Sequence, residues 1–255
     1  MPTVYADNKD ARIISSHDQW FRARDAISGS TQSIPSASES SSPYICGYSG
    51  HNKSVSEFNT GSDYNMIRSF YYFDFSGVTK QVSTATLRIY GLTNGGLDCR
   101  IIKSTAFGCD GQSALATSDW NAITGYNGGG TLSGNVTEYS SEITSWSTSG
   151  YNNFVLNATA IQDINGSMKT SYPGLIVCLI DSDIDYPYNN LDAGGVHPLP
   201  SHNGGYFSEE GGTSKDPKID YTLLEFGKVN GVAKADIGKI NAIGISDIDE
   251  IISIQ

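Results

Sequence analysis

The chain has 255 residues, of which 11% are aromatic and only 17% are charged, and its formal net charge is −11. An acidic surface repels phosphate backbones, so we expect no nucleic-acid partner. No run of Lys or Arg points to an anionic membrane, and no stretch reaches the roughly 20 apolar residues of a membrane span. The abundance of Gly and Tyr is typical of strands joined by polar turns.

The first ten residues contain no apolar segment of the kind that a signal peptide needs, so we expect synthesis in a cytoplasm without export. The four cysteines, Cys46, Cys99, Cys109 and Cys178, form no CxxC pair, which argues against a zinc knuckle or a redox motif. A chain of this length can bury a core without cross-links. Buried free thiols are therefore the expected state, although an even number of cysteines permits disulfides.

In chain order, a mixed segment at 3–27 precedes a Ser-rich loop at 28–42. The strongest strand signal is MIRSFYYFDF at 66–75, in which Tyr71, Phe73 and Phe75 share one face and Phe70 and Tyr72 share the other. Further strands are predicted at 83–91, 97–104, 154–156, 175–180 and 218–224, a short helix or turn at 158–170, and long loops at 118–130 and 181–205. The continuous apolar run at 175–180 predicts a strand covered on both faces. Together these elements predict an all-β fold, an antiparallel jelly-roll β-sandwich over residues 1–224.

Several segments occur in an order that resembles a known pattern. They are SFYYFDFSGV with STATLRIYG, then SDWN, then FVLNATAIQDINGS with GLIVCLI, and finally GGYFSEEGGTSKDPKIDYTL. In this order they resemble the DNRLRE-type and carbohydrate-binding-module-like jelly-roll domains. The resemblance covers about residues 60–224, and it implies a jelly-roll fold and a sugar-binding function.

Sugar binding uses exposed aromatic faces beside polar hydrogen-bonding groups. The candidate ligand-binding residues are Trp120, Tyr126, Trp146, Tyr186 and Tyr188, with Trp20 as a further candidate. Each tryptophan has an alternative role in the core. We favour that role for Trp120, because Trp is highly buried on average.

Three alternate carboxylates, Asp181, Asp183 and Asp185, follow the predicted buried strand directly in the sequence DSDIDY. Alternate side chains of an extended segment point the same way and can converge on a hard cation such as Ca²⁺. The glycine and the terminal glutamate of an EF-hand loop are missing. The two interpretations are therefore a structural Ca²⁺ site of another kind and a solvated acidic turn, and no other cofactor is predicted.

The C-terminal segment 225–255 is nearly free of aromatic residues and repeats with a period of 11: KVNGVAKADIG at 228–238 aligns with KINAIGISDID at 239–249, and EIISIQ begins a third copy. We predict extended pieces at 232–235 and 243–246, alternating with helical turns capped by Asp236 or Asp247. Its apolar positions are Val229, Val232, Ile237, Ile240, Ile243, Ile248, Ile251 and Ile254. So few units cannot bury this stripe alone, so we expect them to assemble with copies of the chain or dock on another protein. The alternative is a tail folded back on its own domain.

The repeat resembles those of bacteriophage structural proteins. No GxSxG, HExxH or P-loop motif occurs, so we expect no enzyme. The first hypothesis is a virion structural protein: a head or tail fibre, decoration or adhesion component. It would be a homo-oligomer, with a trimer favoured, that contacts other virion proteins and bacterial surface glycans. The alternative is a carbohydrate-binding module of a secreted protein.

Overall fold

The computed structural model describes residues 1–33, 44–49, 64–189, 191, 201–208 and 212–224, together with four two-residue strands in the C-terminal segment. The elements are β1 (Thr3–Tyr5), β2 (Ala11–His17), α1 (Trp20–Arg24), β3 (Thr31–Ser33), β4 (Tyr44–Ser49), β5 (Tyr64–Asp74), β6 (Val82–Thr93), β7 (Cys99–Lys103), η1 (Phe107–Cys109), η2 (Thr117–Asn121), β8 (Tyr151–Val155), α2 (Ala158–Ser167), β9 (Gly174–Asp181), β10 (Ser201–Gly205), β11 (Lys218–Leu223), β12 (Lys228–Val229), β13 (Val232–Ala233), β14 (Lys239–Ile240) and β15 (Ile243–Gly244).

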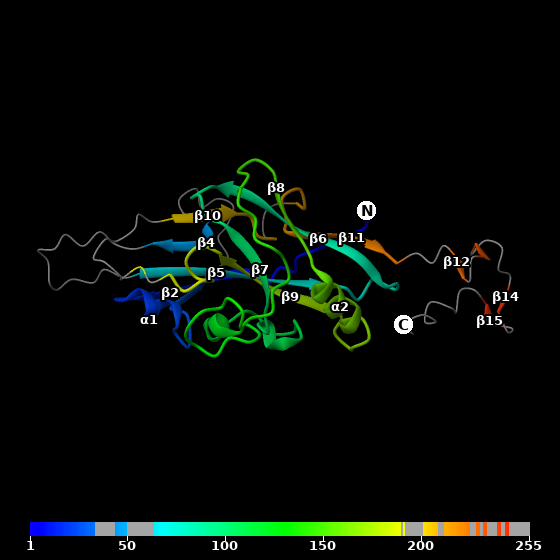
Figure 1. Ribbon diagram of the computed structural model, residues 1–255, viewed down its shortest axis with the longest axis horizontal. Coiled ribbons are helices and arrows are strands. Elements are labelled where there is room, and N and C mark those ends of the chain that lie inside the picture. Colours follow the sequence, from blue (N-terminus) through cyan, green and yellow to red (C-terminus); the bar gives the residue numbers. More distant parts are fainter. Residues whose placement is uncertain are drawn as a thin grey trace, which may run out of the picture.

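Strands β1 to β11 form one hydrogen-bonded network, and all of their pairings are antiparallel. One layer contains β1, β11, β6 and β8, and the other contains β3, β2, β5, β9 and β7. Strands β4 and β10 join the layers, because β10 pairs with β4 on one side and with the end of β6 on the other. Figure 1 shows the long strands running along the longest axis of the molecule. The prediction of an antiparallel all-β, sandwich-like fold is confirmed.

The central strands β5 and β9 are buried on both faces. Tyr71 and Phe73 point into a first core between the two layers, whereas Phe70 and Tyr72 belong to a second core on the opposite face. Strand β9 divides in the same way, because Leu175, Val177 and Leu179 enter the first core and Ile176, Cys178 and Ile180 enter the second. The two-sided burial predicted for 175–180 is therefore confirmed. The sequences of such strands are continuously apolar, because neither face of the strand is exposed to solvent.

Loops and short helices, rather than a third sheet, cover the second core. Helix α1 packs on β5 and β2, while Phe107 of η1 and Trp120 of η2 are fully buried in this core. In Figure 1 these helical turns lie along one side of the sheet. A cover of this kind explains why the predicted loop at 118–130 carries so many buried side chains.

The predicted strands at 66–75, 83–91, 97–104, 154–156, 175–180 and 218–224 all coincide with observed strands, and 158–170 contains helix α2. The cap of α2 is Asn157, whose side-chain oxygen accepts a hydrogen bond from the Ala160 amide at 3.0 Å. Strands β4 and β10 were not predicted; β10 lies at the end of the region 181–205 that was predicted to be a loop. The short strand β3 likewise lies within the predicted loop 28–42.

The C-terminal segment contains two separate antiparallel pairs. Strand β12 pairs with β13 through Val229 and Val232, and β14 pairs with β15 through Ile240 and Ile243. The second pair lies 11 residues after the first, so the sequence repeat gives the same hairpin twice. The predicted extended pieces at 232–235 and 243–246 overlap β13 and β15. Asp236, Asp247 and the remaining apolar repeat positions, Ile237, Ile248, Ile251 and Ile254, lie outside the described residues.

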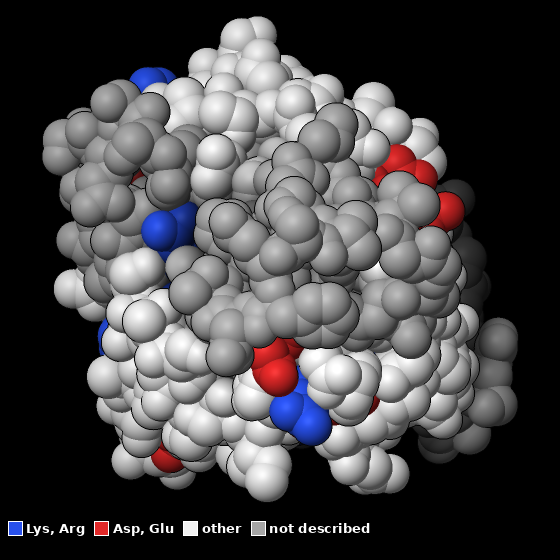
Figure 2. Space-filling model, turned by 90° about the vertical axis from the view of Figure 1, so that its left-hand side faces the viewer, with Lys and Arg blue, Asp and Glu red and all other residues white. Residues whose placement is uncertain are grey.

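Charged side chains are sparse on the face shown in Figure 2. On the described part of that face, Lys and Arg atoms and Asp and Glu atoms form small scattered groups, and one group of each sign adjoins the other near the lower centre. Among the described residues, no helix has the length and apolar character needed to cross a membrane.

Candidate functional site

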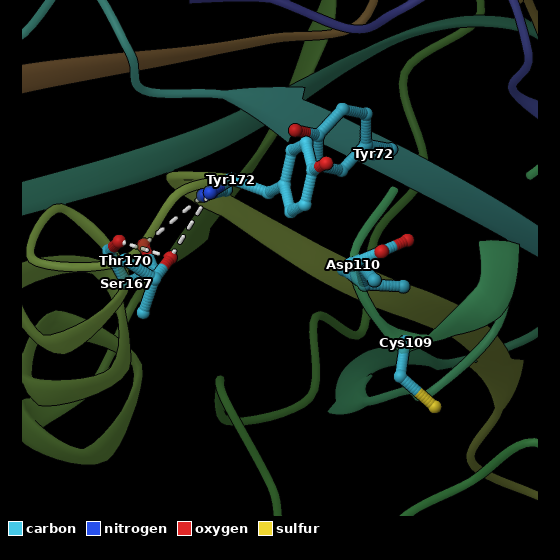
Figure 3. Close-up of a pocket in the computed structure, with 8 residues that line it drawn as sticks. Tyr72, Cys109, Asp110, Ser167, Thr170 and Tyr172 are labelled. Carbon is cyan, nitrogen blue, oxygen red and sulfur yellow. Dashed lines mark hydrogen bonds between the residues drawn. The ribbon is translucent and has the colours of Figure 1, made fainter. Parts of the chain in front are cut away.

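A groove lies where the end of α2, the start of β9 and the turn around η1 meet. It has two adjoining hollows of about 300 Å³ and about 210 Å³. Both are lined by Cys109, Ser167, Gly174 and Ile176, so they form one continuous depression. In Figure 3 the labelled side chains surround the first hollow: Tyr72 and Tyr172 on one side, Ser167 and Thr170 on a second, and Cys109 with Asp110 on a third.

Two tyrosines give the first hollow its aromatic wall. Tyr72 is almost fully buried, and two glycines clasp its ring: a Cβ atom on Gly111 would lie 2.3 Å from the ring, and one on Gly174 would lie 2.2 Å from it. The ring position therefore depends on the absence of side chains at these glycines. Tyr172, by contrast, is 51% exposed. One tyrosine is thus fixed by its neighbours, and the other presents about half of its side chain to solvent at the groove.

Hydroxyl groups of the turn after α2 fix the shape of the groove. Ser167 Oγ donates to the Ile164 carbonyl at 2.8 Å and accepts from the Gly174 amide at 3.1 Å. Thr170 Oγ1 donates to the Ser167 carbonyl at 2.7 Å. These groups are committed to the backbone, so the turn is organised without a ligand.

The Tyr72 hydroxyl is a hydrogen-bond donor that faces the groove. Burial raises the pKa of Tyr72 to about 12, with further contributions from Asp74, Asp7 and Asp110, so the phenol keeps its proton at neutral pH. No hydrogen bond to this hydroxyl is present within the described residues. Asp110 accepts from the Gln112 amide through Oδ1 at 2.9 Å, which leaves Oδ2 as an acceptor. The first hollow therefore offers an aromatic face, a donor and an acceptor.

The second hollow is more polar. Lys103 Nζ lies 2.9 Å from Asp163 Oδ2, and the Tyr139 hydroxyl donates to the same carboxylate oxygen at 2.6 Å. Burial, followed by this hydrogen bond and the carboxylate charge, raises the pKa of Tyr139. A lining with one cation, one anion and one phenol suits a neutral ligand with several hydroxyls better than a ligand of high charge.

The structure brings three of the five predicted ligand residues together at the second core, where Trp120 and Tyr126 are buried and Tyr188 is partly buried. Trp120 is fully buried, and its Nε1 donates to the Arg24 carbonyl at 3.0 Å. The hydroxyls of Tyr126 and Tyr188 donate to Asp25 at 2.7 Å and 3.3 Å. These aromatic rings pack around the guanidinium groups of Arg24 and Arg68, not around an open surface.

The other two predicted ligand residues lie elsewhere. Trp146 is buried in the first core and donates from Nε1 to the Gly204 carbonyl at 3.0 Å. Tyr186 packs under the guanidinium of Arg100, 3.6 Å from the ring centre, and its hydroxyl donates to Glu138. Trp20, the further candidate, is fully buried against Tyr188. None of these six aromatic residues lines the groove.

The three aspartates of DSDIDY have three different environments. Asp181 is buried, and its Oδ1 accepts from the amides of Asp183 and Ile184 at 2.6 Å and 3.0 Å. Asp183 accepts from the Asp98 amide, whereas Asp185 is paired with Arg68. Among the described residues there is no group of three or more His, Cys, Asp or Glu side chains that could hold a metal ion. The three carboxylates therefore do not converge as the calcium hypothesis required.

The groove could not be predicted from the sequence, because its lining residues lie far apart in the chain. They come from the segments around 72, 103–110, 139 and 163–176. One local signal was present: Tyr172 stands between Ser171 and Pro173, where a large aromatic residue in a polar turn has no core to enter.

No protein-family model matches the chain, and no curated protein matches it. The class that the structure defines is thus a broad one. It is an antiparallel, sandwich-like all-β domain with a surface groove that combines aromatic and polar groups, followed by a repeated hairpin segment.

Proposed function

We propose that this chain is a non-enzymatic virion structural protein, a fibre, decoration or adhesion component, whose repeated tail joins copies of the chain. The observation that carries the proposal is the hairpin that occurs twice at a spacing of 11 residues, with Val229 opposite Val232 and Ile240 opposite Ile243. The jelly-roll connectivity of the body is part of the same proposal. It is supported by the position of β11 between β1 and β6.

The physical reason is that an isolated two-stranded hairpin is at best marginally stable in water. Each of these strands has only two residues, so each hairpin is shorter than the strands that usually make a stable sheet. Repeats of this kind become stable when neighbours stack and bury a shared apolar stripe. We propose a homotrimer, with other virion proteins as further partners of the same segment.

The test is the mass in solution of three proteins: the full chain, a chain stopped at Glu225 and a chain stopped at Gly238, which keeps one hairpin. We expect a trimer for the full chain, a monomer without the tail and a weaker, concentration-dependent oligomer with one hairpin. Unchanged circular dichroism of the shortened chains would show that the body still folds. Three monomers would overturn the assembly role.

A second candidate function, saccharide binding, is favoured by the groove. Sugar rings stack on tyrosine faces and exchange hydrogen bonds with hydroxyl and carboxylate groups, and a hollow of about 300 Å³ is at the small end of ligand sites. In a virion protein the ligand would be a bacterial surface glycan. The same groove in a secreted protein would make the domain a carbohydrate-binding module, which is the alternative function.

A glycan array, followed by calorimetry with the best sugar, tests this candidate. The Tyr172→Ala variant should lose at least tenfold in affinity, and Tyr72→Phe should lose less because only the hydroxyl is removed. The matched control is Phe21→Ala, which removes an aromatic residue that is also exposed but lies in α1, away from the groove. Failure of the wild-type protein to bind any sugar on the array would overturn saccharide binding, without affecting the assembly proposal.

A further inference from the structure

Two buried cysteines face each other in the first core. Cys46 lies in β4 and Cys99 begins β7; the side chains are fully buried, and their sulfur atoms are 3.1 Å apart. A disulfide has an S–S distance of about 2.0 Å, so the two sulfur atoms need to approach by only about 1 Å. The residues are 53 positions apart in the chain, so the contact is created by the fold.

The surroundings hold this pair in place. Asn203 lies opposite Cys46 in the β4–β10 register, and its Nδ2 donates to the Leu97 carbonyl at 2.7 Å and to Cys99 Sγ at 3.2 Å. Its Oδ1 accepts from the Gly95 amide at 3.0 Å. This buried amide fixes the turn that leads into β7, so the Cys99 sulfur is directed toward Cys46.

We propose that Cys46 and Cys99 are an oxidisable pair that forms an intrachain disulfide between β4 and β7. The oxidant is a low-molecular-weight disulfide such as oxidised glutathione. One cysteine thiolate attacks a sulfur of this disulfide and releases the first small thiol. The second cysteine thiolate then attacks the resulting mixed disulfide, forms the Cys46–Cys99 bond and releases the second small thiol. The two protons lost by the cysteines end on the two released thiols, so atoms and electrons balance.

The reaction belongs to the folding chain rather than to the closed core. The hydrogen bond with Cys99 and burial raise the pKa of the Cys46 thiol, so the folded site holds little thiolate. Oxidant also has no path to side chains that are fully buried. The bond therefore forms while β4 and β7 are docking, and the finished core then protects it.

The disulfide would link β4 and β7, two strands that do not pair with each other through backbone hydrogen bonds in the described residues. Within the described residues, β4 pairs with β5 and β10, whereas β7 pairs with β9. The other two cysteines provide internal controls. Cys178 is fully buried in the second core, and Cys109 lies exposed at the groove. This inference does not depend on the proposed function.

The test uses the full chain carrying Cys109→Ser, which removes the exposed thiol. The reduced, unfolded protein is refolded in a mixture of oxidised and reduced glutathione, its free thiols are blocked with N-ethylmaleimide, and its mass and peptide map are measured. We expect one blocked thiol, Cys178, and one linked peptide pair containing Cys46 and Cys99. Three blocked thiols, or a linkage that includes Cys178, would overturn the proposal.

A second measurement keeps the test independent of any variant that fails to fold. The melting temperature of the oxidised protein is compared with that of the same sample after reduction, and we expect it to be higher by about 5–10 °C. Cys178→Ala should retain both the linkage and this difference, whereas Cys99→Ala should lose both. If the oxidised protein melted at the same temperature as the reduced protein, or at a lower one, the proposal of a stabilising Cys46–Cys99 disulfide would be contradicted.

Discussion

Arg68 and Asp185 form a two-point ion pair in the second core. Arg68 Nε donates to Asp185 Oδ2 and Nη2 donates to Oδ1, each at 2.8 Å, and both side chains are buried. Arg24 adds two hydrogen bonds to the Asp185 carbonyl, at 3.1 Å and 2.7 Å. The loop after β9 is thereby fixed to β5 and α1. Two arginines meet two carboxylates, those of Asp185 and Asp25, so the charges in this cluster are balanced.

Asp185→Asn should destabilise the protein by about 3–5 kcal/mol, because it leaves Arg68 buried without a full counter-charge. Urea denaturation followed by tryptophan fluorescence measures this loss. The matched control is Asp18→Asn, which breaks exposed contacts with His17 at 2.9 Å and Arg22 at 3.4 Å and should leave the urea midpoint almost unchanged, because water screens such pairs. Equal effects of the two substitutions would contradict a structural role for the buried pair.

The same pair gives a pH dependence. Burial alone would raise the pKa of Asp185, but the charges and hydrogen bonds of Arg68 and Arg24 outweigh it, and the pKa is lowered. The stability that the pair contributes is therefore present above the unfolded pKa of about 3.9 and is lost as the pH falls through the lower folded value. Acid titration of the wild-type protein should show this loss, and Asp185→Asn should lack it.

The pKa of Asp181 is shifted in the opposite direction from that of Asp185. Its carboxyl group is buried, and Oδ2 has no hydrogen-bond partner within the described residues. Burial raises its pKa to about 8, although the amides of Asp183 and Ile184 oppose the shift. The folded protein then keeps a proton that the unfolded chain releases near pH 4, so stability should decrease as the pH rises from about 4 to about 8.

Asp181→Asn should remove this decrease and should make the protein more stable than wild type at pH 8, by about 1–4 kcal/mol. Denaturation midpoints of both proteins, measured from pH 5 to pH 8.5, test the prediction. Parallel pH profiles would show that Asp181 is already ionised in the fold. Below about pH 4 the difference between Asp185→Asn and wild type should shrink, whereas the difference between Asp181→Asn and wild type should grow as the pH rises above 4, so a series extended to pH 2 separates the two effects.

The central strands were predictable from the sequence, because their successive side chains point in turn to the first and to the second core. Phe70 to Phe73 and Leu175 to Ile180 place apolar groups on both faces, which few other structures can accommodate. Strand β10, with the sequence SHNGG, shows no such pattern. It is a strand because β4 and β6 present free backbone groups on either side, which is a property of the fold and not of its own residues.

The site was harder to predict for a related reason. Trp120, Tyr126 and Tyr188 were candidates as separate aromatic residues, but the groups that determine their role, Arg24 and Arg68, come from distant segments. A sequence gives the order of aromatic and charged residues but not which of them meet in the folded chain. It does not show that two guanidinium groups occupy the space where a sugar would stack.

Gly174→Ala should damage the groove and the fold together. The new Cβ atom would overlap the ring of Tyr72, so the ring must move out of its position. We expect a loss of about 1–3 kcal/mol in stability, typical of overpacking, and weaker saccharide binding. Gly166→Ala is the matched control in neighbouring α2, where no atom lies within 4 Å, and it should gain about 0.5–1 kcal/mol. Equal stability of the two variants would contradict the clasp around Tyr72.

The side chain of Asn165 in α2 forms two hydrogen bonds with the backbone of Val82 at the start of β6, as a neighbouring strand would. Its Oδ1 accepts from the Val82 amide at 2.8 Å, and its Nδ2 donates to the Val82 carbonyl at 3.0 Å. Asn165→Asp keeps the acceptor but places a carboxylate oxygen against that carbonyl, so one bond is lost and replaced by repulsion. The expected cost is about 1–3 kcal/mol at neutral pH, and it should shrink at pH 3, where a protonated carboxyl group can donate again.

Thermal denaturation at pH 7 and pH 3 measures this change. The control is Asn153→Asp on the exposed face of β8, which introduces the same charge and should cost less than about 0.5 kcal/mol at either pH. If the two variants behaved alike at pH 7, α2 would be an external attachment to the sandwich. A larger loss for Asn165→Asp would instead show that α2 completes the hydrogen bonding of β6, and so holds in place the turn that shapes the groove.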